Sequence, residues 1–203
     1  MNYVKESAKG IEKVSIDEIL FASREVFLTE PVNVDSSNEL IKQLMVLEKL
    51  NPDEEVTLYI NSPGGEVVSG MAVYDYLRMM KAPVKTVCTG TAASMGAVLF
   101  LAGDKREMLP HTKLMIHDPA YGGGDMAGKK PHELQQYVNN LKKTQEIIVD
   151  VISERTGKSK KEVQKTTRED SYFDATEAIE YGLATGIVAE TNKTLGNDQL
   201  VLG

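Results

Sequence analysis

The sequence predicts an α/β protein in which helices cover the faces of a sheet. Short β-rich runs alternate along the chain with segments whose apolar residues recur at helical spacing. Turn signals such as SPGG at 62–65 separate these segments. A chain of 203 residues with 41% hydrophobic and 26% charged residues is ordinary for one globular domain.

Five segments have the composition of strands. REVFLTEPV at 24–32 is closed by Pro31, and VTLYIN is followed directly by the SPGG turn. The two middle runs, VKTVC and KLMIH, are short and apolar. We therefore expect strands at 24–32, 56–61, 84–88, 113–117 and near 186–190.

Six segments are expected to be helical. In 36–50 the residues Leu40, Ile41, Leu44 and Leu47 share a face, and Ser36 or Ser37 can cap the start. In 66–80 the helical face is formed by Val67, Met71, Tyr74 and Leu77. The run GTAASMGAVLFLAG at 90–103 suits a buried helix that is closely packed at its start.

The remaining three helices are predicted from their end signals. Pro131 begins a long helix to about Arg155, which Gly157 terminates. Ser159 and Glu162 form a capping-box pattern for the next helix. Asp174 and Glu177 begin the last helix, which Gly182 ends.

Composition and motifs argue against several classes of protein. The net charge of −7 is unfavourable for general nucleic-acid binding, and the longest apolar runs, such as 97–102, are too short to span a membrane. Cys88 is the only cysteine, so neither an internal disulfide nor a Cys-pair metal site is possible. The chain lacks the dinucleotide-binding and P-loop glycine patterns. We therefore expect no cofactor and no metal.

Hydrolytic chemistry requires a nucleophile, a base and an acid. Ser94 lies among small residues, which permit close approach of a backbone or a substrate, although spacing alone favours a capping or packing role. His117 ends an apolar strand, whereas His111 and His132 are interpreted as surface residues. Asp118 and Asp170 are the candidate acids, and Asp118 should point away from its neighbour His117. The spacing of Ser94, His117 and the two candidate acids in the sequence does not show whether their side chains are in contact.

Four blocks of sequence, in order, resemble the proteolytic subunit of the Clp protease. They are YINSPGGEVVSGMAVYD (59–75), GTAASMGAVLFLAG (90–103), LPHTKLMIHDP (109–119) and FDATEAIEYGLATGIV (173–188). The resemblance covers roughly 24–190 and implies a ClpP/crotonase-type fold of stacked ββα units with a protruding handle helix. It implies Ser94 as nucleophile, His117 as base and Asp170 as acid, with Gly65 and Met95 donating the oxyanion-hole N–H groups.

The resemblance also implies an organisation for the chain and its assembly. Residues 1–23 would be an N-terminal leader or axial segment, 24–190 the peptidase domain with its handle at about 122–156, and 191–203 a flexible tail. The implied function is a cytoplasmic serine endopeptidase that hydrolyses peptides or unfolded proteins inside stacked heptameric rings, a tetradecamer. An AAA+ ATPase unfoldase is the implied partner, with no nucleic-acid or membrane partner.

Several residues depart from the family pattern. Asp118 stands where glutamine is common, and the order Arg168-Glu169-Asp170 lacks the usual arginine beside the acid. The positions that match the apolar ATPase-docking cleft include Tyr59 but also the polar Thr57, Thr89 and Glu107. These departures keep open a ring subunit that is non-catalytic or works without the usual unfoldase. A crotonase-like acyl-CoA enzyme is a further alternative, which a complete Ser-His-Asp set disfavours.

Overall fold

The computed structural model describes residues 2–7, 10–122 and 128–189. The strands are β1 (Asn2–Ser7), β2 (Gly10–Ser15), β3 (Glu25–Leu28), β4 (Val56–Ser62), β5 (Val84–Ala93), β6 (Lys105–Met108), β7 (Lys113–Ile116), β8 (Ser171–Phe173) and β9 (Gly186–Ile187). The helices are α1 (Ile16–Ala22), α2 (Val34–Leu50), α3 (Val67–Met79), α4 (Met95–Leu101), α5 (Pro131–Thr156), α6 (Lys160–Thr167) and α7 (Ala175–Tyr181).

A mainly parallel sheet forms the centre of the molecule, as expected of an α/β fold. Its strand order is β3-β4-β5-β6-β9, and β7 and β8 continue from the far end of β5. The residues of β5 nearest its start pair with β6, and Thr91–Ala93 at its end pair with β7. The long strand β5 therefore pairs on the same side with two strands in succession, first β6 and then β7.

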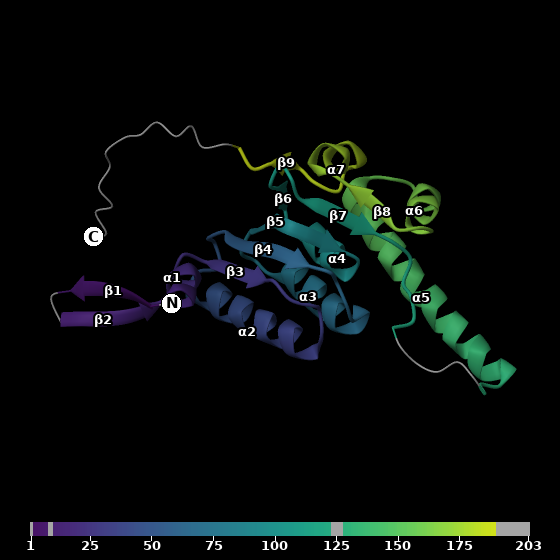
Figure 1. Ribbon diagram of the computed structural model, residues 1–203, viewed down its shortest axis with the longest axis horizontal. Coiled ribbons are helices and arrows are strands. Elements are labelled where there is room, and N and C mark those ends of the chain that lie inside the picture. The colour runs from purple at the N-terminus through teal and green to yellow at the C-terminus, as the bar shows by residue number, and fades with distance from the viewer. Residues whose placement is uncertain (1, 8–9, 123–127, 190–203) are drawn as a thin grey trace.

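Helices bury the apolar side of the sheet. In Figure 1, α2 and α3 lie side by side along one face, and α4 lies close behind the strands. The predicted helical face of α2 is buried at Leu40, Leu44 and Leu47, which belong to the same core as Leu58 and Ile60 of β4. Every residue of α4 is buried, which explains its continuous apolar sequence.

Two elements project from this body. The β1–β2 hairpin extends at one end and α5 at the other (Figure 1). Helix α5 has Pro131 in its first turn and ends at Gly157, whose φ of 75° is left-handed, as the sequence predicts. The hairpin falls in the leader, for which the sequence analysis predicts no strand. Of the expected handle, 123–127 lie outside the described residues, as does the expected tail at 191–203.

The predicted starts of two helices are wrong. The helix expected over 90–103 begins only at Met95, because 91–93 continue β5 and pair with β7, and Ala92 also pairs with β4. The cap of α2 is Asn33 rather than Ser36 or Ser37, since its side chain accepts from the N–H groups of Asp35 and Ser36. Strands β6 and β8 were also not expected.

Candidate active site

Ser94 occupies the sharp turn between β5 and α4. Its φ of 53° and ψ of −120° are unusual for a residue with a side chain, and such a conformation costs roughly 1–3 kcal/mol. The backbone is held there by the hydrogen bond from Ser94 N to the carbonyl of Met115, 2.8 Å long. Its hydroxyl makes no capping bond to α4. This geometry favours a functional side chain over the capping role that the sequence left open.

The small residues around Ser94 allow another turn of the chain to approach it. A Cβ atom added to Gly64 would lie 2.5 Å from the carbonyl oxygen of Ala93 and 2.8 Å from the amide nitrogen of Met95. Gly64 also has a φ of 88°, which favours glycine. The SPGG segment therefore packs directly against the serine turn. Gly64 is a site residue that the sequence analysis did not single out, although the turn signal contains it.

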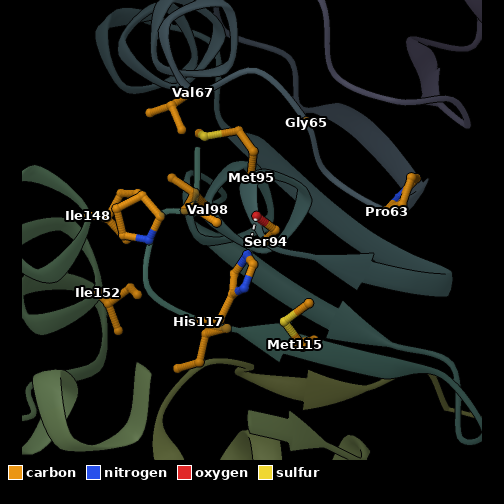
Figure 2. Close-up of a pocket in the computed structure, with 13 residues that line it drawn as sticks. Pro63, Gly65, Val67, Ser94, Met95, Val98, Met115, His117, Ile148 and Ile152 are labelled. Carbon is orange, nitrogen blue, oxygen red and sulfur yellow. Dashed lines mark hydrogen bonds between the residues drawn. The ribbon is translucent and has the colours of Figure 1, made fainter. Parts of the chain in front are cut away.

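The structure brings Ser94, His117 and Asp170 into one hydrogen-bonded row. The Ser94 hydroxyl lies 2.8 Å from His117 Nε2, and His117 Nδ1 lies 3.1 Å from Asp170 Oδ1. Figure 2 shows the serine hydroxyl directed at the imidazole. With the proton on Nδ1, the ring donates to Asp170 and accepts from Ser94. This is the arrangement in which an imidazole can remove a hydroxyl proton.

Strand pairing explains how three residues distant in sequence meet. Ala93 pairs with Met115 in the parallel β5–β7 ladder, so Ser94 follows beside the end of β7. Ile116 pairs with Ser171 in the antiparallel β7–β8 ladder, so His117 and Asp170 are the next residues beyond that pair. The three side chains therefore lie in the same order as the strands beside them: Ser94 after β5, His117 after β7 and Asp170 before β8.

The row runs from the protein interior to its surface. The His117 side chain is 25% exposed and that of Asp170 is 60% exposed. The other two histidines, His111 and His132, are exposed, in a turn and at the start of α5, as expected. Asp118 does not contact His117 in this row. Its carboxylate accepts from Gln145 and Thr167 instead, which agrees with the expectation that it points away.

Two backbone N–H groups are available near the serine. Met95 is the first residue of α4, where N–H groups have no acceptor within the helix. The Gly65 segment is held by the bonds from Val32 N to the Gly64 carbonyl and from Glu66 N to the Val32 carbonyl, each 2.8 Å. Among the hydrogen bonds of the described residues, neither Gly65 N nor Met95 N has a protein acceptor.

A cavity of about 210 Å³ opens beside Ser94 and His117 (Figure 2). Its lining combines the polar groups of Ser94 and His117 with apolar side chains from α3, α4, β7 and α5. They include Val67, Met95, Val98, Met115, Ile148 and Ile152. A cavity with these walls suits an uncharged, apolar side chain.

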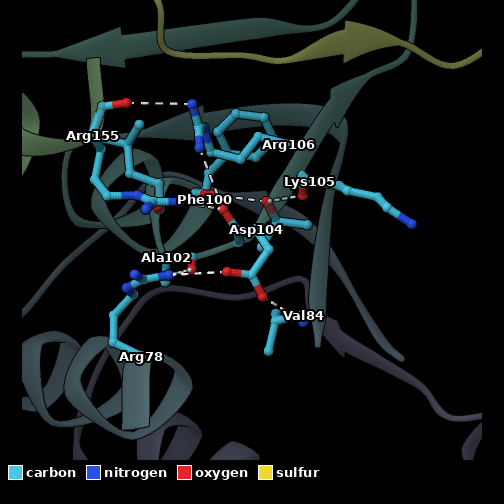
Figure 3. A network of polar contacts seen from close by, with 11 residues as sticks. Arg78, Val84, Phe100, Ala102, Asp104, Lys105, Arg106 and Arg155 are labelled. Carbon is cyan, nitrogen blue, oxygen red and sulfur yellow. Dashed lines mark hydrogen bonds and ion pairs between the residues drawn. The ribbon is translucent and has the colours of Figure 1, made fainter. Parts of the chain in front are cut away.

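Three arginines hold the opposite end of the helix that follows Ser94. Arg155 donates to the carbonyls of Leu101 and Gly103, Arg78 to that of Ala102, and Arg106 to that of Gly103 (Figure 3). Cations at a helix C-terminus satisfy free carbonyls and complement the helix dipole. Arg106 is itself buried, and burial lowers the pKa of its guanidinium. Helix α4 is thus anchored at the end remote from the serine.

Within the described residues, no cluster of histidine, cysteine, aspartate and glutamate could hold a metal ion. Among the same residues, no helix combines the length and apolar character needed to cross a membrane.

Comparison with known proteins identifies the family. The family model described as Clp protease matches residues 8–191. The chain belongs to the Clp protease family. An ATP-dependent Clp protease proteolytic subunit of Deinococcus radiodurans is 33% identical over 97% of this chain and 95% of its own length. An ATP-dependent Clp protease proteolytic subunit 1 of Chlamydia trachomatis serovar D is 41% identical over 87% of this chain and 92% of its own length.

Membership of the Clp protease family confirms the resemblance and the α/β fold derived from the sequence. It also confirms the predicted function, a Clp-type serine peptidase. Both relatives match over nearly their whole lengths, so the likeness is not confined to the blocks around the serine and histidine.

The structure shows how Glu107, one departure from the Clp protease pattern, is paired. A carboxylate at Glu107 would be costly beneath an apolar surface unless it were paired. Lys85, on the neighbouring strand, lies 2.7 Å from Glu107, and both side chains are about one quarter exposed. On the same sheet, Tyr59 donates to Glu25 and stacks on Phe27. The surface of these strands is therefore partly aromatic and partly charged.

Proposed function

We propose that Ser94, His117 and Asp170 are the catalytic triad of this peptidase. The observation that carries the proposal is the row of contacts at 2.8 and 3.1 Å. Ser94 attacks the scissile carbonyl while His117 Nε2 takes its proton. His117 then returns that proton to the leaving amine, and Asp170 stabilises the imidazolium through Nδ1–H. Water attacks the resulting acyl-enzyme by the same path and restores Ser94.

The oxyanion formed in each half of the reaction is assigned to the N–H groups of Gly65 and Met95. Both amides lie on segments fixed by backbone hydrogen bonds, and Met95 adds the N-terminus of α4. Donors fixed in advance act more strongly than water because they need no reorganisation during the reaction. Loss of one such donor reduces the rate by about 10²–10³-fold.

The substrate is a peptide or an unfolded protein segment. The cavity beside Ser94 accommodates one side chain of the substrate. The substrate backbone on either side of that residue must then be extended and accessible. A folded protein does not offer such a segment. The names of the two relatives describe ATP dependence, so we assign the unfolding step to a separate ATPase, with no nucleic-acid or membrane partner.

Self-association into rings, with two heptamers stacked through α5, is part of the same proposal. Helix α5 projects from the body (Figure 1), and Leu134, Val138 and Ile147 on it are exposed apolar residues. When another subunit covers such residues, their apolar surface is removed from water, and this stabilises the assembly. We also place the protein in the cytoplasm, where the ATP named in the relatives' descriptions is available.

Peptide hydrolysis by the purified protein and by Ser94→Ala tests the proposal. Cleavage of a short fluorogenic peptide with an apolar residue before the scissile bond should be lost in the variant. Native mass spectrometry of both proteins should give the same assembly. Undiminished cleavage by Ser94→Ala would overturn the assignment of the nucleophile.

A further inference from the structure

Asp118, the residue after the base, holds three segments together. Its Oδ1 accepts from the Thr167 hydroxyl and its Oδ2 from the Gln145 amide, both at 2.6 Å. Its own amide donates to the Thr167 carbonyl, also at 2.6 Å. Gln145 lies on α5 and Thr167 ends α6. A single carboxylate therefore joins the end of β7 to both helices.

This arrangement fixes His117 from both sides. The preceding residue, Ile116, is held in the β7–β8 ladder by pairing with Ser171. The ladder ends there, so strand pairing does not fix His117 itself. The next residue, Asp118, is held by its three hydrogen bonds. His117 is thus one residue between two anchored neighbours, which limits the rotation of its backbone.

The position of Asp170 depends on the bonds of Asp118 to Thr167 as well as on the β7–β8 ladder, which holds its neighbour Ser171. Asp170 is 60% exposed, so packing does not hold its carboxylate beside the imidazole. It lies three residues after Thr167, which is buried and bonded to Asp118 through both backbone and side chain. A displacement of the end of α6 would move Asp170 away from His117.

We propose that Asp118 is a positioning residue that keeps His117 and Asp170 aligned and links this alignment to α5 and α6. The inference rests on the proposed catalytic triad and adds a residue that does not touch the reacting atoms. Asp118 acts on the rate of the chemical step, because a misaligned base slows proton transfer without closing the substrate cavity.

Steady-state peptide hydrolysis by Asp118→Ala, Asp118→Asn and wild-type protein tests the proposal. Asp118→Ala loses both side-chain acceptors, and kcat should fall by about tenfold or more while KM stays within about twofold. Asp118→Asn should restore most of the activity. Its oxygen can accept from Thr167, and its NH₂ can donate to Gln145 once that amide is rotated. Gln145→Ala and Thr167→Val each remove one link and should give intermediate values of kcat.

The chain offers a matched control. Asp150 of α5 forms an exposed ion pair with Lys160 of α6, 2.7 Å long, which joins the same two helices without the segment of His117. Asp150→Ala should leave kcat within about twofold of wild type, because exposed ion pairs contribute little.

The outcomes separate this inference from the catalytic assignment. A kcat for Asp118→Ala within twofold of wild type would overturn the positioning role, as would an equal loss in Asp150→Ala. If Asp118→Ala fails to assemble in native mass spectra, Gln145→Ala and Thr167→Val decide in its place. Undiminished hydrolysis by Ser94→Ala would overturn the catalytic triad itself, whatever the Asp118 variants do.

Discussion

Ile116 and Ser171 pair across the antiparallel β7–β8 ladder, and this pair sets His117 opposite Asp170. The imidazole and the carboxylate are 53 residues apart in sequence, yet each is only one residue from the paired position. On the other side of β7, the pair Ala93–Met115 places Ser94 within reach of the same ring. The geometry of the site is therefore a consequence of strand register.

Asp170→Asn should reduce kcat strongly while leaving the fold intact. The amide cannot stabilise the imidazolium and can favour the wrong tautomer of His117, which costs up to about 10⁴-fold in a triad. Peptide hydrolysis measures the loss. Glu169→Gln is the matched control, because it neutralises the adjacent exposed carboxylate. Equal activity in Asp170→Asn and Glu169→Gln would remove Asp170 from the triad.

Gly64→Ala should inactivate the enzyme by displacing the turn that carries Gly65. The new Cβ would meet the Ala93 carbonyl at 2.5 Å, and the φ of 88° would strain the alanine. We expect a loss of about 100-fold or more in kcat/KM, because small displacements in a site are costly. In the control, Gly122→Ala, the added methyl has no neighbour within 4 Å among the residues that the structure describes, and activity should be unchanged. Wild-type activity in Gly64→Ala would contradict the close packing of these turns.

Arg106→Met should destabilise the protein. The guanidinium donates to the carbonyls of Leu183, Gly182, Gly103 and Arg155. In the variant the carbonyls of Leu183, Gly182 and Arg155 would lose this donor, whereas that of Gly103 would keep the bond from Arg155. We expect a loss of about 3 kcal/mol and a fall of about 6–12 °C in Tm at matched protein concentration. Lys105→Met removes the adjacent, exposed cation and should leave Tm nearly unchanged. Similar values of Tm for the two variants would show that the buried bonds contribute little.

Cys88 should resist modification in the native protein. Burial raises the pKa of its thiol, so less of the reactive thiolate is present at a given pH than in a free cysteine. A thiol reagent at pH 8 should react slowly with the folded protein and rapidly after denaturation in guanidinium. Raising the pH should speed the native reaction. Rapid stoichiometric modification of the native protein at pH 8 would contradict the burial of this residue.

The parts of the fold with local signals could be predicted from the sequence. Pro131 and Gly157 predict helix α5, and the Asp174 cap and Gly182 predict α7. The end of β5 could not be predicted, because Gly90 and the two alanines at 92–93 have low strand propensity. The two alanines are extended because β7 pairs with both and β4 pairs with Ala92, which is a tertiary effect.

The site was predicted in part for the same reason. Ser94, His117 and Asp170 are candidates from their positions in the sequence, and the resemblance implies their roles. Spacing could not show their contacts, since the contact of His117 with Asp170 depends on the three-residue strand β8. Asp118 was expected only to point away from His117. Its bonds to Gln145 and Thr167 join residues 27 and 49 positions away, and no local pattern carries that information.

Labelling with a fluorophosphonate probe tests the central claim most directly. Of the eleven serines, only one activated by a base should react, and intact-mass analysis with peptide mapping should find a single adduct at Ser94. His117→Ala should abolish that adduct while assembly in native mass spectra is retained. An adduct at a different serine, or undiminished labelling in His117→Ala, would contradict the account.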